Sequence, residues 1–421
     1  MTKTLTIGLS LSLTGEYAAM GRPAEAALAL FVADTNMAGG LQVGGERYEL
    51  VLDCRDDGSR VNRAAEIYRE LCFEHRADLI LGPYSSALTR AAAPLAEEAR
   101  MVFVNHGGAD DSLYDRRARM IVGVLSPASD YMLGFVRLLA TLKLWRKRLA
   151  IVASRGPFAR AVAAGIERAC KARPARRRGV RVRLKYNGGF DGTRTPGVLL
   201  PGLRRTRVNA LISAGGYAHD TAVMRLVVES NFNIPVLGCV AAGVDRFTLD
   251  LGENAEGIVG PSQWEEQAQI MPEFGPAPAE FARRIRTAAR LAACDYPAAQ
   301  AYAAGLVTLA AVRAAGTLEQ ERIRAAFADL RTTTFFGDFA IDRVSGRQVG
   351  HKMLLVQWHR GRKVIIEPEA HTDQGELELP AGWRLIAAGF QYFKLSRRDR
   401  LEHYGGEDGS RDDVPDDEDS D

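Results

Sequence analysis

Short apolar runs rich in β-branched residues alternate with longer alanine-rich patterns along the first 350 residues of the chain. Strand candidates lie at residues 5–13, 47–57, 78–84, 101–109, 148–154, 181–190, 210–216 and 235–240, and helices are predicted between them at 23–36, 61–74, 88–99, 158–172, 198–205 and 220–229. Apolar strands separated by amphipathic helices are typical of parallel sheets built from βαβ units. Two such runs, divided near residues 121–127, predict two α/β lobes.

The pattern changes after residue 255. A strand-like segment at 256–264 is followed by predicted helices at 278–292, 297–315 and 318–329 and by a hairpin-like segment at 335–368. Gly346 and Gly361 occupy its two turns, where we expect positive φ. Residues 369–404 form a C-terminal extension. Residues 405–421 form an acidic tail that we expect to be disordered, because it offers too few apolar groups to offset chain entropy.

The nearly balanced charge of this 421-residue chain is an average of two unlike parts. It has 55 basic and 52 acidic side chains, a net charge of +3, but residues 405–421 hold nine acids and one base. The tail therefore carries 1 − 9 = −8, and residues 1–404 carry 3 + 8 = +11. A basic body with an acidic tail differs physically from a neutral protein.

Hydropathy, the N-terminal pattern and the cysteines bear on the cellular compartment of the protein. The apolar stretch at 298–312 is shorter than the ~18 residues a bilayer needs, so we expect no membrane span. The N-terminus alternates like a strand and lacks a long apolar signal region, so the protein is either cytosolic or without its signal peptide here. The five cysteines form no CxxC pair, which favours free buried thiols over metal ligands or disulfides.

Familiar catalytic and cofactor motifs are absent from the sequence. It contains no G-x-G-x-x-G, P-loop, G-x-S-x-G, H-E-x-x-H or EF-hand pattern, so we expect no cofactor, no metal and no enzyme activity. The most suggestive segment is Gly82-Pro83-Tyr84-Ser85-Ser86, where a strand ends and a helix begins. Two hydroxyls and free N–H groups there offer a seat for a carboxylate or carbonyl oxygen. The alternative is that a serine merely caps the helix.

Two further segments have competing interpretations. The next strand end contains Asn105 and His106, and a histidine that only hydrogen-bonds is favoured there over a catalytic base. The run at 173–185 holds seven basic residues. Aromatic interleaving and a helix-turn-helix are both missing, so we expect a solvated loop and no binding to nucleic acid.

Taken in order, the segments resemble type I periplasmic binding proteins of the branched-chain amino acid (Leu/Ile/Val) receptor family. The resemblance spans roughly residues 4–368 and rests on IGLSLSLTGEYAAMGRPAEAALALFVADTN, LDCRDDGSRVNRAAEIYREL, ADLILGPYSSALTRAAAPLAEE, MVFVNHGG, LAIVASRGPFAR, ALISAGGYAHDTAVMR and LGENAEGIVGPSQW. It implies an α/β fold of two Rossmann-like lobes with parallel sheets, joined by three crossovers and closing on a ligand. It assigns residues 1–123 and 262–350 to one lobe, and 124–261 and 351–368 to the other.

The resemblance also implies a ligand site. The serines that hold the ligand carboxylate in this family correspond to Ser85 and Ser86, and a family threonine is replaced by Ala109. The full expected set comprises Met20, Tyr84, Ser85, Ser86, Asn105, His106, Gly107, Gly108, Ala109, Phe158, Tyr217 and Val240. The carboxylate that pairs with a ligand ammonium is missing from 238–243, with no acid before Asp245. Because a buried ammonium without a partner is costly, we hypothesise a small carboxylate, an aromatic acid or an amide as ligand.

Three functional classes follow from these observations. The leading one is a periplasmic receptor that delivers a small molecule to an ABC permease. The second is a cytoplasmic ligand-sensing regulator, since the Gly-x-Tyr-x-Ser pattern at residues 82–86 is shared with the amide-receptor branch of the fold. The third, an enzyme on the same scaffold, has no nucleophile–base pair or cofactor loop to support it.

Overall fold

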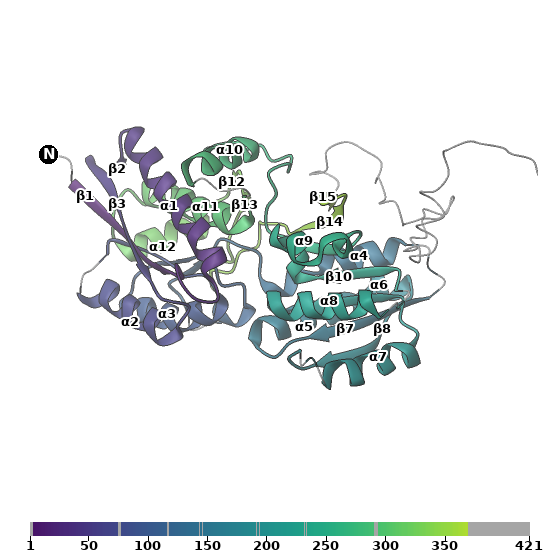
Figure 1. The fold of residues 1–421 in the computed structure, drawn as a ribbon. Helices are drawn as coiled ribbons and strands as arrows, with labels where there is room; N and C mark the ends of the chain where they lie inside the picture. The colour runs from purple at the N-terminus through teal and green to yellow at the C-terminus, as the bar shows by residue number, and fades with distance from the viewer. Residues whose placement is uncertain are drawn as a thin grey trace, which may run out of the picture.

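The computed structural model describes residues 3–368 except for 75–76, 116–117, 143, 145, 191, 193, 231, 233 and 290–293. The expected C-terminal extension and acidic tail, residues 369–421, lie outside the described residues. Figure 1 shows two groups of strands and helices side by side, each built around one large sheet. We call the group around β1–β6 the first lobe and the group around β7–β11 the second lobe.

The first lobe contains a six-stranded sheet in the order β2-β3-β1-β4-β5-β6. Its strands are β1 (Lys3–Leu11), β2 (Leu41–Val43), β3 (Glu46–Asp56), β4 (Leu79–Leu81), β5 (Phe103–Asn105) and β6 (Ile121–Gly123). All neighbours are parallel except β2, which forms a hairpin with β3. Parallel strands need helical crossovers, and these cover both faces of the sheet.

The second lobe contains a seven-stranded sheet in the order β15-β14-β11-β10-β9-β7-β8. Its strands are β7 (Lys147–Ala153), β8 (Val180–Asn187), β9 (Ala210–Ala214), β10 (Val236–Cys239), β11 (Val259–Ser262), β14 (Leu354–His359) and β15 (Arg362–Glu367). The first five are parallel, and β14 and β15 add an antiparallel hairpin at the β11 edge. The expected two-lobed α/β fold is therefore confirmed.

Helices complete an α/β/α sandwich in each lobe. Those of the first lobe are α1 (Ala18–Met37), α2 (Val61–Arg69), α3 (Ser86–Glu98), α10 (Pro278–Ala289), α11 (Tyr296–Ala315) and α12 (Gln320–Asp329). Those of the second are α4 (Leu133–Thr141), α5 (Pro157–Lys171), α6 (Arg173–Arg177), α7 (Arg194–Thr206), α8 (Tyr217–Glu229) and α9 (Arg246–Leu251). Apolar residues alternate between the two faces of each sheet and pack against these helices.

Two sequence expectations need correction. The hairpin-like segment at 335–368 is not one unit, because β13 (Gly337–Phe339) forms one antiparallel hairpin with β12 (Thr332–Thr334) and β14 forms a separate hairpin with β15. The glycines at both expected turns do adopt positive φ, 73° at Gly346 and 74° at Gly361. The basic run at 173–185 is not a solvated loop. It folds into the short helix α6 and most of the edge strand β8, because Ala175, Val180 and alternating apolar residues pack inward.

Helix α11 is the longest apolar element of the first lobe. With 20 residues and a mean hydropathy of 1.2, it has the length and composition of a membrane span, contrary to the sequence expectation. However, 72% of its apolar window is buried inside the protein, and its alanines pack against α1 and the first sheet. Both properties follow from its place as a central core helix. The five cysteines are free, and four of them are buried, as the sequence predicted.

Three chain segments connect the two sheets, following β6, following β11 and preceding β14. Buried hydrogen bonds join all three. The Gln263 side chain accepts from the Ser126 N–H at 3.1 Å and donates to the Ser126 carbonyl at 3.1 Å. Ser126 Oγ lies 2.7 Å from His351 Nδ1. We propose that the lobe boundaries lie within these segments, between residues 123 and 124, 261 and 262, and 350 and 351.

Removing the Gln263 amide tests the importance of this junction. Gln263→Leu leaves the buried N–H and carbonyl of Ser126 without partners, so we expect the free energy of unfolding to fall by about 1–3 kcal/mol. Gln42→Leu, on an exposed position of β2, is the matched control and should change it by less than about 0.5 kcal/mol. Urea unfolding followed by circular dichroism measures both, and equal losses would contradict the prediction.

Candidate functional site

The carboxyl ends of the parallel strands of both lobes carry the candidate site. In parallel α/β sheets these ends hold ligands, because loops diverge there and helix N-termini point toward the opening. The loops after β4 and β5 contribute from the first lobe, and those after β7, β9 and β10 contribute from the second. All twelve residues predicted from the sequence lie at the ends of these strands, on the segments that follow them, or in the first turn of the next helix, with Met20 in the first turn of α1.

The two serines after β4 play different parts. Ser85 precedes α3 in an extended conformation, and its buried hydroxyl makes no hydrogen bond of normal geometry with the described residues. The Tyr17 phenol is the polar group beside it. Ser86 Oγ instead accepts from the N–H groups of Ala109 and Asp110, each at 3.1 Å. Ser86 therefore holds the next loop in place, while the Ser85 hydroxyl is available.

The loop after β5 is held together by its own polar groups. Asn105 Oδ1 accepts from the Gly108 N–H at 2.8 Å, and Asn105 Nδ2 donates to the Gly108 carbonyl at 2.6 Å and to Tyr114 Oη at 2.7 Å. A Cβ atom on Gly107 would lie 2.3 Å from the Pro83 carbonyl oxygen. Gly107 is thus required by the close approach of the β4 and β5 loops, and Asn105 acts as a positioning residue.

His106 is fully buried at the end of β5. Burial lowers the pKa of its imidazole to about 4, so the ring is neutral at physiological pH. Neither ring nitrogen makes a hydrogen bond of normal geometry with a described residue, although the carbonyls of Gly82 and His106 itself lie beside the ring. The low pKa argues against a general base near pH 7, and the role of His106 as a hydrogen-bonding loop histidine stays a prediction.

Aromatic rings from distant parts of the chain surround these loops. Tyr84 Oη lies 3.4 Å from Tyr296 Oη at the start of α11, and the Tyr17 ring meets the Tyr84 ring edge-on at 6.4 Å. In the second lobe, Tyr131 meets Phe158 edge-on at 5.3 Å. Tyr131 and Tyr296 escaped the sequence analysis because neither follows a strand, which was the pattern used to find site residues.

One apolar cluster joins predicted residues of both lobes. Ala109 is buried with Tyr131, and Phe158 and Val240 pack against the same cluster. The Ala109 carbonyl also accepts from the Ala128 N–H at 2.6 Å, directly after the first crossing segment. Two predicted residues lie apart from this cluster. Tyr217 packs with the α7–α8 side of the second sheet and donates to Asp250 at 2.7 Å, and Met20 is half-buried on α1.

A buried carboxylate that the sequence did not reveal lies at the ends of β9 and β10. Asp220, in the first turn of α8, accepts from Ser213 Oγ at 2.7 Å and from the Ala241 N–H at 3.0 Å. Burial raises the pKa of this carboxyl to about 7. Both oxygens are occupied, so Asp220 fixes the loop that carries Val240.

Asp245, the first acid after β10 in the sequence, is already paired. Lys363 Nζ on β15 lies 3.0 Å from Asp245, 2.8 Å from Glu265 and 3.1 Å from Asp295. Burial disfavours the charged lysine, but the three carboxylates together hold its pKa above its usual range. Asp295 precedes α11 in the first lobe, and it also accepts from the Asp245 N–H. This group, which we call the Lys363 cluster, is therefore an ionic contact between the lobes.

Comparison with known proteins assigns the family. A family model described as periplasmic binding protein matches residues 4–363, nearly all of the described chain. The chain belongs to the periplasmic binding protein family, which confirms the resemblance inferred from its motifs.

Solved structures of ABC-transporter receptors share the fold. An ABC transporter substrate-binding protein from Desulfitobacterium hafniense, in complex with leucine, has a TM-score of 0.72 at 16% identity and covers 86% of this chain and 100% of its own. A leucine-binding protein from Thermotoga maritima has a TM-score of 0.70 at 18% identity, covering 88% and 99%. A solute-binding protein from Rhodopseudomonas palustris, in complex with 3,4-dihydroxybenzoic acid, has a TM-score of 0.67 at 16% identity, covering 86% and 95%.

The pH dependence of stability tests the buried state of Asp220. Its pKa is raised, so the folded protein retains a proton up to about pH 7 that the unfolded chain releases near pH 4. The free energy of unfolding should therefore fall as pH rises between these values, by up to ~1.4 kcal/mol per pH unit.

Asp220→Asn should reduce this slope, whereas Glu49→Gln at an exposed position should leave it unchanged. Glu265, whose pKa burial also raises to about 7, contributes in the same direction, so we expect a reduced rather than a flat profile. Urea titrations across this pH window provide the measurement. An unchanged slope in Asp220→Asn would show that Asp220 is ionised in the folded protein.

Proposed function

We propose that this protein is a non-catalytic solute receptor that closes its two lobes around a small molecule with a carboxylate or carbonyl head and an apolar or aromatic body. The observation that carries the proposal is the Ser85 hydroxyl, which is buried at the N-terminus of α3 and makes no hydrogen bond of normal geometry with the described residues, with the Tyr17 phenol beside it. A buried polar group left without a partner costs free energy, which a bound ligand would recover.

The position of Ser85 suits an anionic or carbonyl oxygen. The first N–H groups of a helix have no partner within the helix, and the helix dipole places partial positive charge there. Helix α3 has 13 residues and begins directly after Ser85. Tyr17 adds a phenol on the same side. A ligand oxygen at this point would accept hydrogen bonds from a hydroxyl and from backbone amides at once.

The surrounding rings suit the body of such a ligand. Tyr84 and Tyr296 from the first lobe and Tyr131 and Phe158 from the second present aromatic surface near the facing loops. Aromatic side chains bind flat apolar groups through large contact areas and edge-on packing. Ala109 supplies a methyl group where the family resemblance implies a threonine hydroxyl, which would make this part of the site more apolar.

Recognition of an α-amino group is disfavoured because the nearby acids are occupied. Both oxygens of Asp220 accept hydrogen bonds from the protein, and Asp245 pairs with Lys363. Burying an ammonium without a free carboxylate costs several kcal/mol. Relatives of this fold bind leucine in one case and 3,4-dihydroxybenzoic acid in another. The arrangement here favours the second kind of ligand.

A thermal-shift panel tests the ligand class. We expect benzoate, 4-hydroxybenzoate, 3,4-dihydroxybenzoate or benzamide to raise Tm by several degrees at saturating concentration, because a ligand that binds only the folded state stabilises it. Leucine and valine should cause no shift. Stabilisation by leucine or valine, with none by the acids or the amide, would overturn the proposed ligand class.

Two serine variants distinguish ligand contact from structural support. Ser85→Ala should weaken ligand binding about tenfold, a loss of ~1.4 kcal/mol, while leaving Tm of the ligand-free protein unchanged. Ser86→Ala removes the acceptor of two backbone N–H groups and should lower the Tm of the ligand-free protein. Isothermal titration with the acid that shifts Tm most gives the affinities. Normal affinity in Ser85→Ala would exclude this hydroxyl from the site.

We further propose that the receptor works in the periplasm and passes its ligand to an ABC permease. Family membership supports this, since periplasmic binding proteins serve ABC transporters. Osmotic-shock fractionation of native cells should release the protein with periplasmic markers. Recovery with cytoplasmic markers would instead favour the ligand-sensing regulator, whose Gly-x-Tyr-x-Ser pattern this chain shares at residues 82–86.

A further inference from the structure

The positive charge of the chain is concentrated in one segment. Residues 155–210 hold 15 basic and two acidic side chains, a net charge of 15 − 2 = +13. Because residues 1–404 carry +11, the remainder of that body carries 11 − 13 = −2. Residues 405–421 carry −8. One stretch of the sequence therefore accounts for the whole basic excess, and one short segment holds a large acidic excess.

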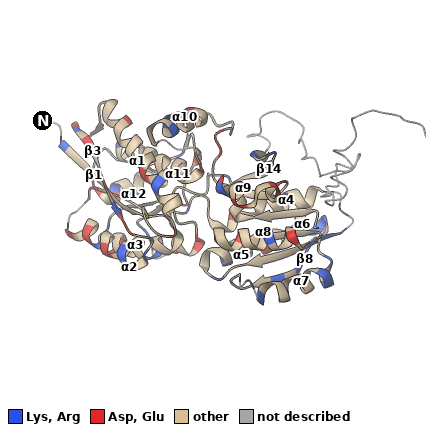
Figure 2. Ribbon diagram, in the orientation of Figure 1, with Lys and Arg blue, Asp and Glu red and all other residues tan. Residues whose placement is uncertain are grey.

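The structure gathers this charge at the β8 edge of the second lobe. Figure 2 shows lysine and arginine along α6, β8 and α7. The exposed basic residues of this region, which we call the β8-edge surface, are Arg160, Arg168, Lys171, Arg173, Arg176, Arg177, Arg178, Arg181, Arg183, Lys185, Arg204, Arg205 and Arg207. Helices α5 and α6 pack on one face of the second sheet and α7 packs on the other, so these charges lie on both sides of the β8 edge. Many like charges around one sheet edge create a positive potential there.

Internal ion pairs neutralise little of this surface. Lys185 pairs with Glu167 at 2.7 Å, and Arg181 donates to the carbonyls of Arg176 and Val180. Among the described residues, the three consecutive arginines at 176–178 form no ion pair with an acid. Like charges held this close repel one another, which destabilises the fold unless an anion screens them.

Protection of the sheet edge explains only part of the charge. Basic residues on an edge strand hinder pairing with another sheet, and Arg181, Arg183 and Lys185 on β8 suit that purpose. The basic residues of α5, α6 and α7 do not lie on the edge strand, so this explanation does not cover them.

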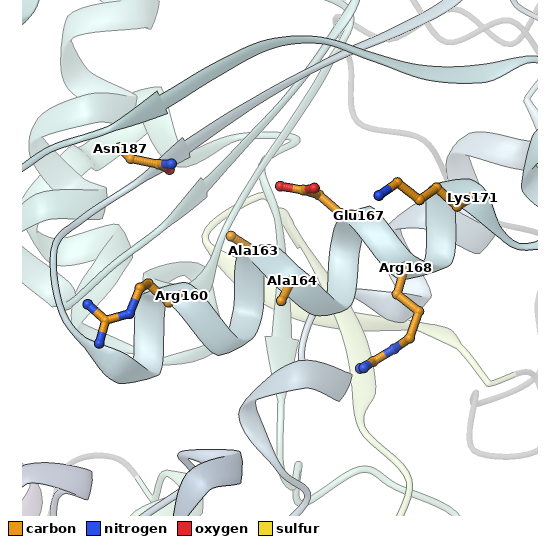
Figure 3. Close-up of a pocket in the computed structure, with 7 residues that line it drawn as sticks. All are labelled: Arg160, Ala163, Ala164, Glu167, Arg168, Lys171 and Asn187. Atoms are coloured by element: carbon orange, nitrogen blue, oxygen red, sulfur yellow. The ribbon is translucent and has the colours of Figure 1, made fainter.

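A hollow beside β8 gives this surface a shape as well as a charge. It has a volume of about 570 Å³ and lies between α5 and the end of β8. Figure 3 shows Arg160, Arg168 and Lys171 projecting from α5, with Ala163 and Ala164 between them, Asn187 on the adjacent strand, and the acid Glu167 also lining the hollow. Glu167 is paired with Lys185 at 2.7 Å, so its negative charge is balanced within the surface. Small apolar side chains flanked by cations suit an acidic peptide segment, whose carboxylates pair with arginine and lysine.

We propose that the acidic segment 405–421 of the same chain binds to the β8-edge surface. Opposite charges of −8 and +13 favour this pairing over any other segment of the chain. The 36 residues from 369 to 404 span up to roughly 120 Å when extended, whereas seven strands measure about 29 Å across. Tethering raises the local concentration of the segment to about the millimolar range, so weak ionic contacts are enough.

Zero-length carbodiimide crosslinking of the full chain, followed by mass spectrometry, tests the proposal. At low salt we expect carboxylates of 405–421 to link to Lys171 and Lys185 about tenfold more often than to Lys3 or Lys352, which are exposed on the first lobe and near the crossing segments. Raising the salt to 1 M shortens the Debye length to about 3 Å and should remove the preference. Mixing isotope-labelled and unlabelled protein separates links within one chain from links between copies.

Matched charge reversals sharpen the result. Arg176→Glu with Arg177→Glu and Arg178→Glu should abolish the preference, whereas Arg47→Glu with Arg69→Glu and Arg100→Glu, all exposed on the first lobe, should retain it at the same net charge. Equal linking to all lysines, or links formed mainly between copies, would overturn the proposal. A vesicle-binding experiment adds a second check, with a variant in which five tail aspartates are changed to Asn: Asp412, Asp413, Asp416, Asp417 and Asp419. If phosphatidylglycerol vesicles bind the full chain and this variant equally, the proposal is overturned, because the acidic segment would then not cover the surface.

Discussion

The two lobes depend on a small set of buried hydrogen bonds where the chain crosses between them. Gln263 exchanges two hydrogen bonds with the Ser126 backbone and donates to Tyr131 Oη at 3.1 Å, while Ser126 Oγ contacts His351. Ser126, Gln263 and His351 come from three different crossing segments, and Tyr131 lies in the turn just before α4. Because these groups are buried, losing one partner leaves another unsatisfied. The junction therefore holds the strand ends of the two sheets in a fixed position relative to each other, although no continuous sheet of the described residues joins them.

In the candidate site, too, most polar side chains are used for hydrogen bonds within the protein. Asn105, Ser86 and Asp220 are polar and follow strand ends, yet each is occupied in holding a loop. In the proposed site, the groups left for a ligand are the Ser85 hydroxyl beside Tyr17, the helix N–H groups and the aromatic rings. Recognition by such groups depends more on shape and on a single oxygen than on paired charges. Because the nearby carboxylates are already hydrogen-bonded or ion-paired within the protein, a ligand with an ammonium group is disfavoured.

Much of the fold could be predicted from the sequence because the hydrophobic patterns of strands and helices depend on residues close together in the chain. β1 and α1 were predicted within a few residues, since a strand or helix pattern depends on neighbours in the chain. The candidate site residues after strand ends were chosen from the same local patterns and stay predictions. Tyr131, Tyr296 and Asp220 were not chosen, because they reach the site from helices and crossing segments whose placement depends on tertiary packing. The basic run at 173–185 was misjudged because charge masked the inward-facing Val180 and Val182.

Charge differs between the two edges of the second sheet, and this difference affects where the proposed acidic segment can bind. Strand β15, the last before residues 369–421, forms the sheet edge opposite β8. The Lys363 cluster sits at that edge, with three carboxylates around one ammonium, so its net charge is negative when all of them are ionised. We expect the acidic segment 405–421, which follows this edge after residues 369–404, to be repelled by the cluster and attracted to the far edge. The potential across the sheet thus favours the β8-edge surface even before any specific contact forms.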